Sequence, residues 1–188
     1  MIWILIGIIV GSVALDQLTK WLAVVFLQPE GAAGSFHLWE NVLHLTYVKN
    51  EGAAFGMLAD HRWVFMVFST VAIIGLSVYL FGFSKDNKWV KISLAMIIGG
   101  GIGNMIDRVL LEYVIDFIDF TLINFAVFNV ADSFVTVGAF MLIGYFLKDF
   151  IVELRSPKTE QTNESEAEPQ TDNVSEEQTH DEPTNGAS

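Results

Sequence analysis

Two aspartates in the second half of the sequence are candidates for acid–base catalysis, because each lies among apolar residues. Asp116 lies in the apolar stretch 114–117, and Asp132 closes the stretch 128–132. Two carboxyl groups that lie close together share a proton, because both cannot ionise easily. One can then activate water as a general base while the other donates a proton. This is aspartyl peptidase chemistry, which requires no metal and no cofactor.

Other residue types are weaker candidates for catalysis. Asp119 lies three residues after Asp116, and we expect it at the wet surface. The histidines lack metal-ligand spacing such as His-Glu-x-x-His, and the serines of the apolar segments have no nearby base. The absence of cysteine excludes thiol nucleophiles, thiolate metal sites and disulfides.

Four apolar segments can position these groups in a membrane. A helix needs roughly 20 apolar residues to cross the hydrocarbon core, and the segments at about 1–26, 63–83, 90–111 and 132–152 approach that length. The first has no Lys or Arg before Lys20, so a retained helix fits better than a cleaved signal peptide, which opens with positive charge. The sequence predicts an all-α membrane protein with four transmembrane helices.

The basic residues predict the orientation of these helices. Six of them lie between the second and third helices or after the fourth: Lys85, Lys88, Lys91, Lys148, Arg155 and Lys158, whereas only Lys49 and Arg62 lie in the first loop. Because cytoplasmic loops are enriched in Lys and Arg, both termini are predicted to be cytoplasmic. The loop at about 27–62 and the connection at about 112–131 then face outward.

Several polar residues fall toward that outer end of the predicted helices: Asp16, Lys20, Asn104, Asp107 and Arg108. An ionisable group inside a span costs at least about 2.5 kcal/mol and is a functional candidate by default. We expect Asp107 and Arg108 to support the site through partners such as Asp16 or Lys20. The glycine-rich run 99–103 would allow a close backbone approach, although small residues are also ordinary in membrane helix packing.

The outer loop and the C-terminal tail differ from the helical body. Residues 41–48 are partly β-branched or aromatic and alternate to some extent, which predicts a small sheet on the outer membrane surface. Residues 156–188 are almost devoid of apolar side chains and cannot offset the entropy of ordering. We therefore predict a 1–155 transmembrane domain followed by a disordered acidic cytoplasmic tail.

Five motifs together resemble one known family, the lipoprotein signal peptidases, also called signal peptidase II, which are aspartyl peptidases of bacterial membranes. The motifs are DQLTK at 16–20, NEGAAFG at 50–56, GGIGNMIDR at 100–108, VIDF at 114–117 and FNVAD at 128–132. One such motif would be a weak signal. Five in family order inside four predicted spans are highly specific, and they cover the chain from about residue 10 to 150.

The resemblance implies a role for each matching residue. Asp116 and Asp132 would form the catalytic dyad. Ten other residues would line, brace or support the site: Asp16, Lys20, Asn50, Gly52, Gly100, Asn104, Asp107, Arg108, Asn129 and Ala131. Asn129 is also a suitable cap for the fourth helix, and the helix dipole would favour the ionised form of Asp132.

The resemblance also implies a substrate, a location and a fold detail. The substrate would be a prolipoprotein with a lipobox, cut on the amino side of a cysteine that carries a diacylglyceryl group. The enzyme would lie in the bacterial cytoplasmic membrane, in contact with lipid and with its active site toward the outer leaflet. The outer loop would form a β-cradle with a short surface helix acting as a lid.

Two functions from other classes remain open. A small transporter or proton-conducting bundle could relay protons through buried aspartates, and a non-catalytic scaffold could bind lipidated partners. Transport sites tend to lie near the bilayer midplane, whereas the polar residues here collect toward one face, which favours an enzyme. The sequence has no basic patch of the kind that binds nucleic acid, so we do not expect nucleic acid as a partner.

Overall fold

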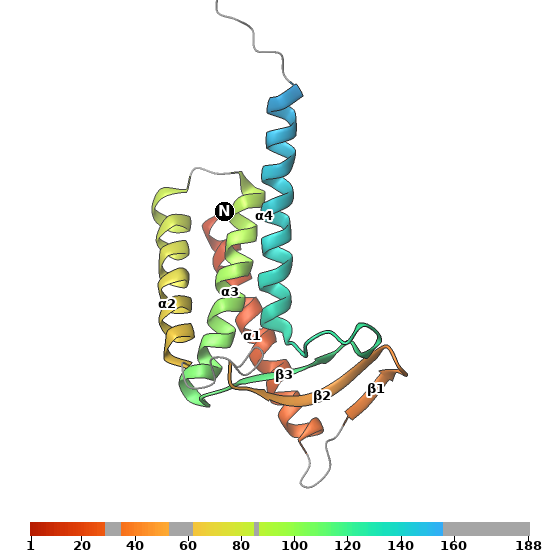
Figure 1. Cartoon of the computed structure of the whole chain (residues 1–188). Helices are drawn as coiled ribbons and strands as arrows, with labels where there is room; N and C mark the ends of the chain where they lie inside the picture. The colour runs from red at the N-terminus through yellow and green to blue at the C-terminus, as the bar shows by residue number, and fades with distance from the viewer. Residues whose placement is uncertain (29–34, 53–61, 85–86, 156–188) are drawn as a thin grey trace, which may run out of the picture. The chain divides into compact units, whose positions relative to one another are not determined.

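The computed structural model describes residues 1–28, 35–52, 62–84 and 87–155 (Figure 1). The chain divides into two units, Met1–Arg155 and Ser156–Ser188, and the described residues all belong to the first. The predicted disordered tail lies outside them and stays a prediction. The surface helix predicted in the outer loop also stays a prediction, because residues 29–34 and 53–61 of that loop lie outside the described residues.

Within the described residues, four helices are long and apolar enough to cross a membrane. They are α1 (Ile2–Leu27), α2 (Arg62–Val78) continued by the π-helical turn η3 (Tyr79–Phe83), α3 (Lys88–Leu110) and α4 (Val130–Arg155). Asn87 caps α3, because its side-chain oxygen accepts a hydrogen bond from the Trp89 amide at 3.2 Å. The predicted fold class of four transmembrane helices is confirmed.

A three-stranded antiparallel sheet lies at one end of the bundle, as Figure 1 shows. Its strands are β1 (Ser35–Trp39), β2 (Leu43–Asn50) and β3 (Val114–Asp119), in the order β1-β2-β3. Asn41 turns the chain between β1 and β2 with a left-handed φ of 61°, a conformation that asparagine tolerates well. A 3₁₀ turn, η4 (Thr121–Ile123), follows β3.

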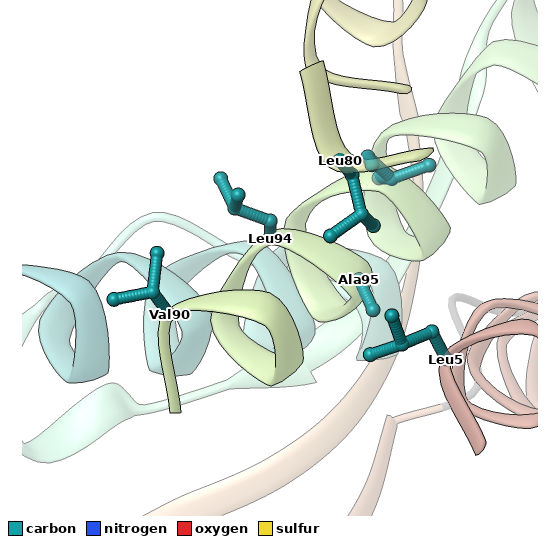
Figure 2. Close-up of a cluster of buried hydrophobic side chains, with 6 residues drawn as sticks. Leu5, Leu80, Val90, Leu94 and Ala95 are labelled. Atoms are coloured by element: carbon teal, nitrogen blue, oxygen red, sulfur yellow. The ribbon is translucent and has the colours of Figure 1, made fainter. Parts of the chain in front are cut away.

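The helix α3 runs between the other three helices of the bundle (Figure 1). At the end away from the sheet it packs Val90, Leu94 and Ala95 against Leu5 of α1 and Leu80 of η3, as Figure 2 shows. Since lipid tails are as apolar as leucine, such helices associate through close van der Waals packing rather than through exclusion of water. The interior of the bundle therefore depends on a tight fit between side chains.

A second apolar cluster fixes the sheet to the bundle. Ala23 and Leu27 in the last turns of α1 pack against Ile115 and Phe117 of β3. All four side chains are buried. Because β3 also carries Asp116, this contact determines where that carboxyl group lies relative to the helices.

Glycines allow α3 and α4 to approach closely. A Cβ atom on Gly138 of α4 would lie 2.8 Å from the carbonyl oxygen of Ser93 and 2.9 Å from Cγ1 of Ile97. A Cβ atom on Gly100 of α3 would collide with the carbonyl oxygen of Ala131 and lie 2.8 Å from Cγ2 of Val135. Contacts this short leave no room for a larger residue at either position.

This packing predicts a difference between two glycine substitutions in α4. Gly138→Ala should destabilise the protein by about 1–3 kcal/mol, because the added methyl group overpacks the α3–α4 contact. Gly144→Ala is the matched control, since nothing lies within 4 Å of a Cβ atom there. The control should be neutral or slightly stabilising, because alanine favours a helix over glycine. Equal free energies of unfolding for both variants in detergent would contradict the close approach.

Candidate active site

The first turn of α4 is held by a reciprocal cap. Asn129, the residue before the helix, accepts a hydrogen bond at its Oδ1 atom from the Asp132 amide at 3.0 Å. Asp132 in turn accepts one at Oδ2 from the Asn129 amide at 3.2 Å. This is the geometry of a capping box, with Asn and Asp in the two positions. The predicted cap at Asn129 is confirmed, and the Asp132 carboxyl group lies at the amide end of α4.

The side-chain amide of Asn129 connects this turn to the second aspartate. Its Nδ2 atom donates to Oδ1 of Asp116 at 2.7 Å and to Oδ1 of Asn104 at 2.9 Å. Asn104 in turn donates from Nδ2 to Oδ1 of Asp132 at 2.7 Å. Two asparagines thus join Asp116 and Asp132, although the two aspartates come from a strand and a helix.

The other oxygen of Asp116 is held from β2. Asn50 Nδ2 donates to Asp116 Oδ2 at 2.8 Å, and Asn50 Oδ1 accepts a hydrogen bond from the Gly52 amide at 2.9 Å. Gly52 has a φ of 87°, a left-handed conformation that a residue with a side chain rarely adopts. The glycine therefore allows the turn that orients Asn50 toward the carboxyl group.

The environment of Asp116 favours its protonated form. The residue is 1% exposed, and this burial raises the pKa of Asp116 from 3.8 to about 6. Hydrogen bonds from Asn50 and Asn129 and the charge of Lys20 act in the opposite direction, while the nearby charge of Asp132 raises the pKa further. Asp116 can therefore carry a proton near neutral pH, which an exposed aspartate does not.

Beside these groups lies a buried ion cluster built on Lys20, which is 2% exposed. Its Nζ atom contacts Oδ2 of Asp16 at 2.8 Å, Oδ2 of Asp107 at 2.9 Å and Oδ1 of Asn104 at 2.8 Å. These three acceptors match the three hydrogens of the ammonium group. The expectation that Asp107 has a partner across the bundle is confirmed, and Asn104 links the cluster to Asp132.

The two carboxylates of this cluster also bind backbone. Asp16 Oδ1 accepts a hydrogen bond from the Ala131 amide at 2.9 Å, and Asp107 Oδ2 accepts one from the Ile115 amide at 3.2 Å. Asp16 thereby satisfies one of the free amides in the first turn of α4. Asp107 holds β3 at Ile115, the residue that precedes Asp116.

Gln17 is a member of this cluster that the sequence analysis missed. Its Nε2 atom donates to Oδ1 of Asp107 at 2.9 Å, and to Oδ2 of Asp16 and the carbonyl oxygen of Gly103 at 3.2 Å each. An amide between Asp16 and Lys20 inside an apolar helix is itself a signal, since a neutral polar side chain there also needs partners.

The remaining predicted residues occupy different positions. Arg108 is half-buried at the end of α3, and its side chain takes part in none of the side-chain hydrogen bonds and ion pairs among the described residues. Asp119 is half-buried at the end of β3, where it pairs in register with His44 of β2. The rings of His37 and His44 stack with centroids 4.1 Å apart. No group of three residues suited to hold a metal occurs in the described part of the chain.

Four membrane-capable helices with a buried cluster of carboxylates and amides at one end define a class, the polytopic membrane proteins with a polar site between their helices. The family model described as signal peptidase (SPase) II matches residues 8–148. The chain therefore belongs to the signal peptidase II family, and it is a peptidase.

Relatives and solved structures agree with this membership. A lipoprotein signal peptidase of Caldanaerobacter subterraneus subsp. tengcongensis is 49% identical over 142 residues, which is 76% of this chain and 94% of that protein. One of Shouchella clausii is 42% identical over 147 residues, covering 78% and 91%. A bacterial membrane enzyme solved by the in meso method at 2.3 Å superposes with a TM-score of 0.72 and 30% identity, covering 90% of this chain and 96% of that one.

The buried ion cluster predicts a large loss of stability on removing its cation. Lys20→Met should lower the free energy of unfolding by about 3–5 kcal/mol, because it leaves two buried carboxylates without their counter-charge. Lys148→Met removes an exposed lysine of α4 and should change stability by no more than about 0.5 kcal/mol. Unfolding of both variants in the same detergent compares them. A Lys20→Met variant as stable as the control would show that the cluster does not hold the helices together.

Proposed function

We propose that this peptidase removes signal peptides from prolipoproteins whose lipobox cysteine carries a diacylglyceryl group, cutting on the amino side of that cysteine. Family membership supports the reaction and the class of substrate. The observation that carries the proposal is the contact of a single residue, Asn129, with both Asp116 and Asp132. Asp116 and Asp132 then act as the catalytic dyad.

The two carboxyl groups take different roles on this proposal. Asp132 lies at the amide end of α4, where the helix dipole favours a negative charge, so it acts as the general base. Asp116 is buried and holds the shared proton. Environments that separate the proton affinities of two carboxyl groups are what acid–base catalysis requires.

The reaction then proceeds in two steps without metal or cofactor. Asp132 removes a proton from water as the water oxygen attacks the scissile carbonyl carbon, and Asp116 donates its proton to the carbonyl oxygen. In the tetrahedral intermediate the C–N bond breaks, Asp132 passes its proton to the leaving amine, and a hydroxyl proton returns to Asp116. The products are a signal peptide with a new carboxyl end and a lipoprotein with a free cysteine amine.

The supporting residues hold this arrangement in place on the same proposal. Asn50, Asn104 and Asn129 orient the carboxyl groups, while Gly52 and Gly100 allow the backbone positions that this requires. The helices α1, α3 and α4 are joined next to the dyad by Asp16, Lys20, Asp107 and Ala131. Arg108 lines the site on the strength of the family resemblance alone.

We propose that the site faces the outer leaflet of the bacterial cytoplasmic membrane, with both termini in the cytoplasm. Of the described basic residues, Lys88, Lys91, Lys148 and Arg155 lie toward the helix ends away from the sheet, whereas Lys49 and Arg108 lie at the sheet end and Lys20 is paired in the buried cluster. The larger number of unburied lysines and arginines at the far end supports this orientation, because cytoplasmic segments are enriched in Lys and Arg. Acyl chains of a substrate could then stay in lipid while water reaches the scissile bond.

The distribution of buried charge argues against a proton-conducting bundle. Among the described residues, the buried ionisable side chains are Asp16, Lys20, Asp107 and Asp116. Toward the other end of the bundle, the buried polar side chains in the described part of the chain are Ser12 and Ser93. A proton relay across the membrane needs titratable groups at successive depths, and this chain gathers them at one.

Replacing either aspartate of the dyad tests the proposed function. Asp116→Asn and Asp132→Asn should each lower kcat for cleavage of a diacylglyceryl-modified prolipoprotein by about 10²-fold to 10⁴-fold or more, the range of general acid–base catalysis. Cleavage is followed by the mass shift of the substrate. Both variants should insert and fold, because an asparagine retains the size of the side chain.

Asp119→Asn is the matched control, since Asp119 lies on the same strand and outside the hydrogen-bond network of the dyad. It should cleave at a normal rate. Near-normal turnover by Asp116→Asn or Asp132→Asn would remove the dyad assignment, and a folded but inactive Asp119→Asn variant would mean that the wrong carboxyl group was chosen.

The proton on Asp116 predicts the pH dependence of cleavage. Because burial raises the pKa of Asp116 to about 6, the acid form persists up to that pH, and kcat/KM should fall as pH rises through it. Asn50→Ala removes a hydrogen bond that lowers this pKa, so the falling limb should move to higher pH. Thr46→Ala, on the same strand, should leave the limb unchanged. A profile of kcat/KM against pH that is identical for all three proteins would contradict the proposed acid.

A further inference from the structure

The segment that links the two aspartates of the proposed dyad has an apolar, exposed tip. It runs from Phe120 to Val130 and contains no ionisable residue. At the tip, which we define as residues 122–125, the side chains of Leu122, Ile123 and Phe125 are 67%, 67% and 55% exposed. Exposed apolar side chains gathered on a loop outside the spanning helices indicate a surface that meets an apolar partner.

This tip is a structured element rather than a loose loop. Asn124 turns the chain with a left-handed φ of 47°, and its amide donates to the Thr121 carbonyl oxygen at 3.3 Å. At its base, Ile118 and Phe128 exchange backbone hydrogen bonds of 2.8 and 3.1 Å. The arrangement therefore keeps the apolar side chains presented outward.

Aromatic contacts fix the tip to β3. The Phe128 ring stacks on Phe120 with centroids 5.9 Å apart and meets Phe125 edge-on at 5.7 Å. Contacts of this kind are worth about 0.5–1.5 kcal/mol each beyond the area they bury. Because Phe128 pairs with Ile118 two residues after Asp116, a shift of the tip would be transmitted to the strand that carries this aspartate.

The position of the tip decides which partner it meets. Phe125 lies five positions before Val130, where α4 begins, so the tip lies at most roughly 18 Å from the end of a membrane span. The outer surface of α4 then exposes Val137 and Phe140, side chains that face lipid in a spanning helix. The apolar tip is thus continuous in sequence with a lipid-facing surface.

We propose that residues 122–125 insert into the interfacial layer of the outer leaflet and anchor the segment between Asp116 and Asp132 at a defined depth. The irregular backbone of the tip restricts how far it enters, since lipid-exposed loops do not occur in the hydrocarbon region. At the level of the lipid headgroups, the apolar and aromatic side chains can contact lipid while the irregular backbone stays outside the hydrocarbon region. The partner is the lipid surface itself, and this anchoring does not depend on the identity of the substrate.

The absence of cysteine allows a direct test. Leu122→Cys and Ile123→Cys, each labelled with a polarity-sensitive fluorophore in the full-length protein, are reconstituted into phosphatidylcholine–phosphatidylglycerol vesicles. Glu40→Cys is the matched control, because Glu40 is an exposed charged residue in the turn between β1 and β2. Thermal unfolding of each labelled variant verifies that the protein is folded.

Labels at 122 and 123 should be quenched several-fold more by lipids with a nitroxide near the headgroup than by aqueous iodide, and more than by a nitroxide near the chain end. The label at 40 should show the reverse preference for iodide. Iodide quenching at 122 and 123 equal to that at 40 would overturn the proposal. Protection that appears only on adding prolipoprotein, or only at high protein-to-lipid ratio, would also overturn it in favour of substrate docking or self-association.

Discussion

The ion cluster on Lys20 is the interaction on which the other contacts of the site depend. An ammonium group buried between helices is costly, so its three hydrogens must all find acceptors. Those acceptors come from α1 and α3, and one of them, Asn104, continues to Asp132 at the start of α4. The charge balance of one residue therefore determines the relative positions of three helices.

Neutral amide side chains provide the hydrogen bonds that the buried carboxyl groups of this site need. Four carboxyl groups lie around one buried lysine, those of Asp16, Asp107, Asp116 and Asp132. Further cations would satisfy the carboxylate oxygens but would also lower the pKa of Asp116 and remove its proton. Four amide side chains supply these hydrogen bonds without adding charge, those of Gln17, Asn50, Asn104 and Asn129. Amide donors thus orient the carboxyl groups, while burial raises the pKa of Asp116.

Local sequence properties predict much of this fold but little of its long-range pairing. Apolar length predicts the spans, and the setting of Asp16, Lys20 and Asp107 predicts a polar cluster. The strand β3 is not predicted, because Asp116 interrupts its apolar residues and its partner Asn50 lies 66 residues earlier. For the same reason, spacing alone left open which partner Asp107 takes across the bundle, and it contacts Lys20.

The position of the site at the helix ends follows from the backbone as much as from the side chains. The first amides of any helix lack partners within the helix, and in lipid they must be satisfied by protein. In α4 the Ala131 amide donates to Asp16 and the Asp132 amide to Asn129. A carboxylate that satisfies such an amide is stabilised by the helix dipole and connects two helices at once. Hydrolysis needs water, and the lipid-attached substrate that we propose needs the bilayer. The helix ends are where both are within reach.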